Sequence, residues 1–214
     1  MRADLTEVVM IIDRSGSMSS CKVESENGVN FFIDEQKKQP GECTFSLVQF
    51  DSEYEFLYNG VPISTVGKFE MHPRGMTALL DAVGRAINET GERLSKMNEV
   101  DRPGLVVFCI ITDGGENSSH AFTKSQVKEM VERQQKDYQW KFVFLGANQD
   151  AFGEAASMGI ARGGVANYSV TSSGPACSGL AMNVSRMRSA TSSGGVVDMS
   201  YTAEELGAMM GAVQ

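Results

Sequence analysis

A short polar loop follows the first apolar run of the chain and carries oxygen-bearing side chains at every second position. It reads Asp13-Arg14-Ser15-Gly16-Ser17. Gly16 permits a sharp turn, so the carboxylate of Asp13 and the hydroxyls of Ser15 and Ser17 can face one point. Such hard oxygen donors suit Mg²⁺, Mn²⁺ or Ca²⁺, and they suit zinc poorly because no histidine or thiolate lies nearby in sequence. The loop therefore predicts a site for a magnesium-like ion.

A second apolar run ends in the same way. Residues 105–111 form a continuous apolar segment, and Thr112 and Asp113 follow it directly. In open parallel sheets, ligands bind beyond the carboxyl ends of the strands, where the strand order changes direction. Asp13 and Asp113 each follow a central strand, so we expect both carboxylates at one edge of the sheet.

The rest of the pattern predicts the scaffold that positions these residues. Apolar runs bounded by turn residues alternate with segments of helical spacing. Predicted strands cover residues 8–12, 43–50, 54–58, 105–111, 140–145 and 165–170, and predicted helices cover 23–38, 77–97, 123–135, 154–158 and 179–190. Thr77 is the expected N-cap of the strongest helix. The fold class is α/β: a Rossmann-like, doubly wound, mostly parallel central sheet with one antiparallel edge hairpin and helices on both faces.

Five of these positions together resemble a known family. An Asp-x-Ser-x-Ser motif after the first strand, a threonine opening a later helix and an aspartate after the fourth strand are similar to a von Willebrand factor type A (VWA) domain with an intact metal-ion-dependent adhesion site (MIDAS). Here they are Asp13, Ser15, Ser17, Thr77 and Asp113. The ordered set is specific, whereas Asp-x-Ser-x-Ser alone is weak. The resemblance covers roughly residues 5–190, so we expect residues 1–190 to form the VWA domain and 191–214 a flexible linker with a short C-terminal helix.

The resemblance implies a divalent-metal-dependent protein-binding module and no enzyme. Ser15, Ser17 and, depending on conformation, Thr77 would touch Mg²⁺ directly, and Asp13 and Asp113 would act largely through bound waters. Mn²⁺ or Ca²⁺ would also fit. An Asp or Glu carboxylate of a partner protein would complete the coordination. Stand-alone cytoplasmic domains of this kind commonly accompany AAA+ ATPases, chelatases or stress-response operons in bacteria, and small phage-encoded versions occur, so an AAA+ ATPase or operon partner is expected.

Two other interpretations account for parts of the pattern. Aspartates at strand ends also cap helices or hold turns, and serines in a glycine-containing loop are usually turn residues. A metal-dependent phosphatase is the rival activity, because haloacid-dehalogenase-like enzymes also have an aspartate after the first strand. Those enzymes need a second aspartate two positions after the nucleophile, where this chain has Ser15. The agreement of all five positions favours the binding module.

Several polar residues near the predicted site are assigned no metal role. Asp51 follows the second predicted strand, so it either lies on the same rim of the sheet or, as its turn position favours, is a solvated turn acid. Glu116 and Asn117 either support the site, contact a partner or are ordinary loop residues. His72 and His120 have no sequence partner for catalysis, so both are expected on the surface.

Composition limits the compartment and the partners. The 214 residues include 19 Lys+Arg and 27 Asp+Glu, a formal net charge of −8. An acidic chain argues against nucleic-acid binding, which needs a basic face, and favours a partner that offers one carboxylate within a basic surround. No apolar run is long enough for a membrane helix. Four widely spaced cysteines and an N-terminus without an export signal predict reduced thiols and a cytoplasmic location.

Overall fold

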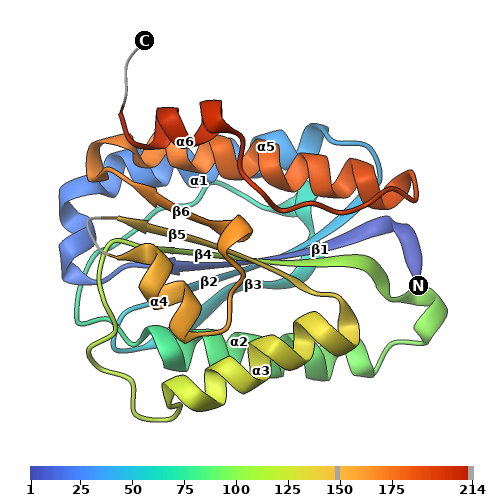
Figure 1. Ribbon diagram of the computed structural model, residues 1–214, viewed down its shortest axis with the longest axis horizontal. Helices are drawn as coiled ribbons and strands as arrows, with labels where there is room; N and C mark the ends of the chain where they lie inside the picture. Colours follow the sequence, from blue (N-terminus) through green and yellow to red (C-terminus); the bar gives the residue numbers. More distant parts are fainter. Residues whose placement is uncertain (148–149, 212–214) are drawn as a thin grey trace.

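The computed structural model describes residues 1–147 and 150–211 and places six strands of these residues in one sheet. The strand order is β3-β2-β1-β4-β5-β6, and every neighbouring pair is parallel except β2 and β3. The strands are β1 (Arg2–Asp13), β2 (Glu42–Phe50), β3 (Tyr54–Pro62), β4 (Pro103–Thr112), β5 (Lys141–Ala147) and β6 (Val165–Tyr168). The predicted mostly parallel sheet with one antiparallel edge hairpin is confirmed (Figure 1).

Helices cover both faces of the sheet. Figure 1 shows α1 (Lys22–Lys38), α5 (Ser173–Ser192) and α6 (Ala203–Met209) on one face, and α2 (Leu79–Ser95), α3 (Lys124–Tyr138) and α4 (Ala151–Ser157) on the other. Short 3-10 turns connect the elements: η1 (Gly16–Cys21), η2 (Ile63–Thr65), η3 (Glu99–Asp101), η4 (Arg162–Gly164) and η5 (Val170–Ser172). Each face of the sheet therefore has its own apolar core.

Strand β1 contributes to both cores, which explains the unbroken apolar run at its residues 8–12. Val8, Met10 and Ile12 pack on the side of α1 and α5, and Val9 and Ile11 pack on the side of α2. All of these side chains are fully buried. A central parallel strand needs apolar residues at every position because both of its faces are covered. The first polar groups after this run consequently mark the end of the strand, at the edge of the sheet.

Helix α2 starts two residues later than predicted, and Thr77 does not cap it. The residue before the helix is Ala78, which has no side-chain acceptor. The amide of Leu80 instead donates to the carboxylate of Glu116 (2.9 Å), and the next amide donates to Ser119 Oγ (3.0 Å). The predicted cap is wrong because a loop distant in sequence supplies the acceptors that the helix start needs. The hydroxyl of Thr77 is thereby left for another role.

The C-terminal quarter contains more helix than its sequence predicts. α5 begins at Ser173, six residues before the predicted start. Pro175 lies in its first turn, where the missing N–H would have no helical partner. The helix continues to Ser192 and so includes two residues of the predicted flexible linker. α6 opens with a capping box, in which the side chains of Thr202 and Glu205 bond each other's backbone.

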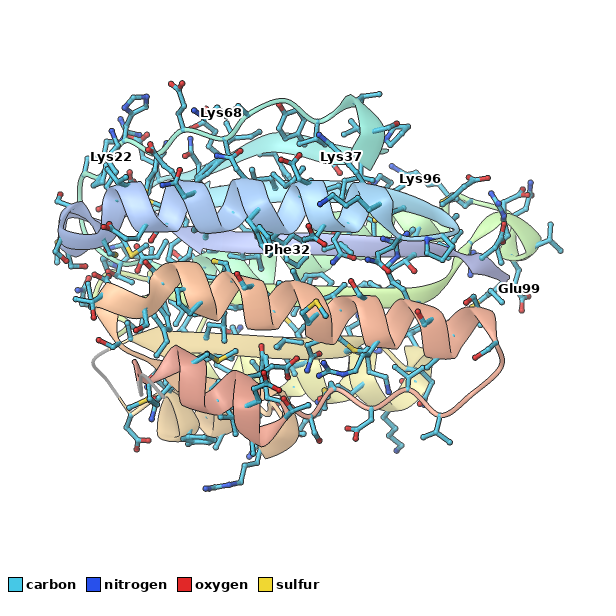
Figure 2. All side chains as sticks on the ribbon, turned by 90° about the horizontal axis from the view of Figure 1, so that it is seen from above. Lys22, Phe32, Lys37, Lys68, Lys96 and Glu99 are labelled. Atoms are coloured by element: carbon cyan, nitrogen blue, oxygen red, sulfur yellow. The ribbon has the colours of Figure 1, made fainter. Side chains whose placement is uncertain are left out.

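Helix α6 lies beside α5 (Figure 2). Met209 is fully buried, and its terminal methyl group lies close to Gly179 of α5. The predicted boundary between residues 1–190 and 191–214 stays a prediction, and residues 212–214 of that segment lie outside the described part of the chain. Within residues 1–147 and 150–211, no helix has both the length and the apolar character that a membrane crossing requires.

A glycine allows α1 and α5 to pack closely against each other. A Cβ at Gly28 would lie 2.8 Å from both the Cβ and the Sγ of Cys177, and 3.2 Å from the carbonyl oxygen of Ser173. Cys177 is buried and unpaired, and burial raises the pKa of its thiol to about 12. Any side chain at position 28 must therefore push the two helices apart.

We expect Gly28→Ala to lower the free energy of unfolding by about 1–3 kcal/mol, because the added methyl group overpacks the contact between α1 and α5. Gly207→Ala in α6 is the matched control, since nothing lies within 4 Å of its added Cβ. That control should leave stability unchanged or raise it by up to about 1 kcal/mol through helix propensity. Urea unfolding followed by circular dichroism measures both variants. A Gly28→Ala protein as stable as Gly207→Ala would contradict this packing.

Candidate metal centre

The five predicted metal-site residues meet where β1 and β4 end at the same edge of the sheet. β1 and β4 are parallel neighbours, with Ile12 opposite Ile111, so the residues that follow them emerge side by side. Ser17 Oγ donates to Asp113 Oδ1 at 2.6 Å, across 96 residues of sequence. The hydroxyl oxygens of Ser15 and Ser17 lie 3.0 Å apart. The second predicted aspartate is thus joined directly to the serine loop.

Gly114 shows that Thr77 and Asp13 belong to the same cluster. A Cβ added at this glycine would lie 3.3 Å from Thr77 Oγ1, 3.6 Å from Ser17 Oγ and 3.9 Å from Asp13 Oδ2. Three oxygens from two separate segments, residues 13–17 and Thr77, therefore face one space beside Gly114. A side chain there would crowd Thr77 Oγ1, and the hydroxyl and carboxylate oxygens around this position suit a small hard cation.

The environment of the Asp13 and Asp113 carboxylates favours a bound cation. Asp13 is fully buried, and this burial raises its pKa to about 6 even though the hydroxyl of Thr112 (2.6 Å) and the amide of Ser15 (2.6 Å) both donate to it. Burial also raises the pKa of Asp113. A desolvated carboxylate with a second one nearby is stabilised as an anion by a bound cation. The donor set therefore fits a divalent ion.

Asn117 holds Thr77 in the cluster. Its side-chain oxygen accepts a hydrogen bond from the backbone amide of Thr77 (2.9 Å). Its backbone amide in turn donates to the carbonyl of Thr77 (3.1 Å). Asn117 thus supports the site, which is one of the roles left open for the two polar loop residues. Glu116 accepts a hydrogen bond from the amide of Leu80 at the start of α2. Sequence reasoning missed this clamp because its two halves are 40 residues apart.

Asp51 is not the solvated turn acid that its position predicts. It is 2% exposed and binds two arginines, Arg14 Nε at 2.9 Å and Arg74 Nε at 2.8 Å. Burial alone would raise its pKa, but the donated amide of Glu53 and the two guanidinium groups outweigh it and hold the pKa below the usual value. The prediction is wrong because Arg14 turns away from the serine loop and needs a buried counter-charge.

Arg14 and Asp51 connect the serine loop to the segment before Thr77. The Arg14 side chain also binds Glu55 on β3 (2.8 Å), and the backbone carbonyl of Arg14 accepts the amide of Arg74 (2.8 Å). The carbonyl of Asp51 accepts the amide of Ala78 (3.0 Å). Bonds of this kind fix three loops relative to one another before any ligand arrives.

The cluster is not a conventional histidine, cysteine or multiple-carboxylate metal site. Within residues 1–147 and 150–211, no three His, Cys, Asp or Glu side chains gather in a metal-binding group. The donors are three hydroxyls and two carboxylates, which is the chemistry that the sequence predicts for this edge. His72 and His120 are both exposed, as expected.

Solved structures match the fold, although no protein-family model and no curated protein matches the sequence. Proximal thread matrix protein 1 from the mussel byssus aligns with a TM-score of 0.61 and 15% identity over 87% of this chain and 46% of its own. A von Willebrand factor type A structure from Catenulispora acidiphila aligns with a TM-score of 0.57 and 13% identity over 85% of this chain and 43% of its own. The chain has a VWA fold. It spans less than half the length of these two structures.

Two further structures with this VWA fold contain a metal ion. One is the mussel protein with a zinc-occupied MIDAS motif, at a TM-score of 0.57 and 14% identity over 84% of this chain and 46% of its own. The other is the manganese-loaded TRAP protein of Plasmodium vivax, at a TM-score of 0.53 and 15% identity over 81% of this chain and 72% of its own. At these identities the likeness establishes the fold of the present chain alone.

We expect Asp51→Asn to lower the free energy of unfolding of this VWA fold by roughly 3 kcal/mol, because removing one partner of a buried ion pair leaves Arg14 poorly compensated. Glu53→Gln is the control, since the Glu53 side chain is 72% exposed and pairs with Arg74 at the surface. Its cost should stay below about 0.5 kcal/mol. Chemical denaturation of both variants gives the comparison, and equal losses would show that Asp51 has no special role.

Proposed function

We propose that the chain is a divalent-metal-dependent protein-binding module with an intact MIDAS. The observation that carries this proposal is the convergence of Asp13, Ser17 and Thr77 on the space beside Gly114, with Ser15 and Asp113 bonded to Ser17. These are the five positions that the resemblance to VWA domains assigns to the metal. Their placement around one space supports a shared ligand.

The hydroxyls of Ser15, Ser17 and Thr77 would hold Mg²⁺ directly, and Asp13 and Asp113 would act mainly through waters. Neutral ligands in contact with the ion leave most of its positive charge unneutralised. A bound Mg²⁺ would therefore supply an electrophilic position for a carboxylate of a partner protein. Mn²⁺ and Ca²⁺ take the same oxygen donors. The zinc and manganese in the two metal-containing structures support a divalent cation.

Binding without catalysis is the proposed activity. A phosphatase of the type considered above needs an acid two positions after Asp13, and Ser15 occupies that position with its hydroxyl directed to Ser17. Asp13 itself is fully buried and accepts two hydrogen bonds, which makes it a poor nucleophile toward an external substrate. Both features favour the binding module.

The partner is proposed to be a protein with an exposed Asp or Glu in a cytoplasmic complex. All four cysteines are unpaired and buried, a state that suits a reducing compartment. A stand-alone regulatory role beside an AAA+ ATPase or an operon partner is part of this proposal, and it depends on the resemblance alone.

Saturating Mg²⁺ should stabilise the protein, by about 2.7 kcal/mol at a hundred times the dissociation constant, because the ion binds the folded state alone. Excess EDTA should reverse the effect. Ser17→Ala and Asp113→Asn should each remove most of it, whereas Ser19→Ala, an exposed serine on the same turn, should retain it. Chemical denaturation with and without Mg²⁺ or Mn²⁺ is the measurement. Identical curves for the wild-type protein with and without either ion would refute the proposal.

A further inference from the structure

Residues 74–76, here called the rim segment, border the candidate metal centre. The carbonyl of Gly75 accepts the amide of Gly16 in the serine loop (3.2 Å), and Thr77 follows directly in the chain. Gly75 has a φ of +69°, and an added Cβ there would lie 3.3 Å from the Asp51 side chain, so glycine lets the segment lie flat against its neighbours. The residues on either side of it are exposed.

Met76 presents an apolar surface beside the hydroxyl cluster. It is 53% exposed although it is adjacent to Thr77, which is 3% exposed. Its amide is fixed by Ser52 Oγ (3.1 Å), so the backbone that carries the side chain is anchored. An exposed methionine on a fixed backbone is an adaptable contact for an apolar partner residue.

The guanidinium group of Arg74 is partly exposed, and two carboxylates fix its orientation. Its Nε donates to Asp51 and its Nη2 donates to Glu53 (2.6 Å), while its side chain is 54% exposed. Within the described residues its Nη1 makes no hydrogen bond. Arg74 shares Asp51 with buried Arg14 and also pairs with Glu53, which leaves Nη1 as its unbonded donor group. It therefore retains the capacity to bind a further acceptor.

Two carboxylates near the site, Asp81 in the first turn of α2 and Glu116 on the loop after β4, accept backbone amides. Asp81 accepts the amides of His120, Ala121 and Phe122, and Glu116 accepts the amides of Leu80, Ser118 and Ser119. Several N–H groups around a carboxylate compensate much of its charge locally. The surface at the site therefore repels anions less than the net charge of −8 suggests.

We propose that the rim segment selects the partner: an acidic protein segment whose metal-directed carboxylate is flanked by an apolar residue, which packs on Met76, and by a second carboxylate, which binds Arg74. This inference rests on the proposed function, since it assumes that one carboxylate reaches the metal. Composition alone predicts a partner whose carboxylate lies within a basic surround. For the partner residues nearest the metal, we propose an apolar residue and a second carboxylate instead.

Panning a phage-displayed random peptide library on the full chain in Mg²⁺, with elution by EDTA, tests the proposal. Eluted peptides should carry two acidic residues and an apolar residue within a short window. A synthetic copy of the most enriched peptide should bind Met76→Gln and Arg74→Gln about five- to tenfold more weakly than wild type, the size expected for one partly buried side chain or one charged contact. Both variants should keep the wild-type stabilisation by Mg²⁺.

Met182→Gln and Arg133→Gln are the matched controls, because Met182 is also 53% exposed and Arg133 is an exposed arginine paired with Asp137. Both should bind the peptide as the wild type does. Peptides that EDTA releases but that bind all four variants equally would overturn this inference and leave the proposed function standing. Failure to recover any EDTA-released peptide, with no stabilisation by Mg²⁺, would overturn both.

Discussion

The burial of one carboxylate shapes the functional edge of this protein. Asp13 ends the central strand and is fully buried, and each of its oxygens accepts one hydrogen bond, from the Ser15 amide and from the Thr112 hydroxyl. Those two donors do not offset the loss of water, since the pKa remains raised to about 6. A buried carboxylate with too few donors is costly unless a cation accompanies it. In the proposed function, the surrounding loops would provide the remaining ligands for such a cation.

That arrangement depends on contacts among segments far apart in the sequence. The Arg14 and Asp51 ion pair joins the serine loop to the turn between β2 and β3, and Asn117 ties Thr77 to the loop after β4. The acceptors for the start of α2 come from that same loop, which leaves the Thr77 hydroxyl directed at the cluster. Each of these contacts uses a backbone group or a buried charge. The side-chain oxygens of the cluster are therefore held in position without a bound ion.

The sequence predicts the sheet and the meeting of its two strand-end aspartates at one edge because both follow from short-range patterns. Buried parallel strands are continuous apolar runs, and Asp13 and Asp113 are the polar residues that end two of them. The remaining errors concern pairings across long separations. Nothing local distinguishes a solvated Asp51 from one paired with an arginine 37 residues earlier, and Thr77 has the residue type of a helix cap. Local propensity also missed residues 173–178 of α5, which include a glycine and a proline, although the helix as a whole packs against α1.

The most direct test of the central claim is anomalous X-ray diffraction from crystals grown or soaked with Mn²⁺, recorded at the manganese absorption edge. We expect a single strong peak in the space beside Gly114, within coordination distance of the hydroxyls of Ser17 and Thr77 and absent from crystals of Ser17→Ala. A protein saturated with Mn²⁺ that shows no peak there, or a peak bound by other residues, would contradict the account.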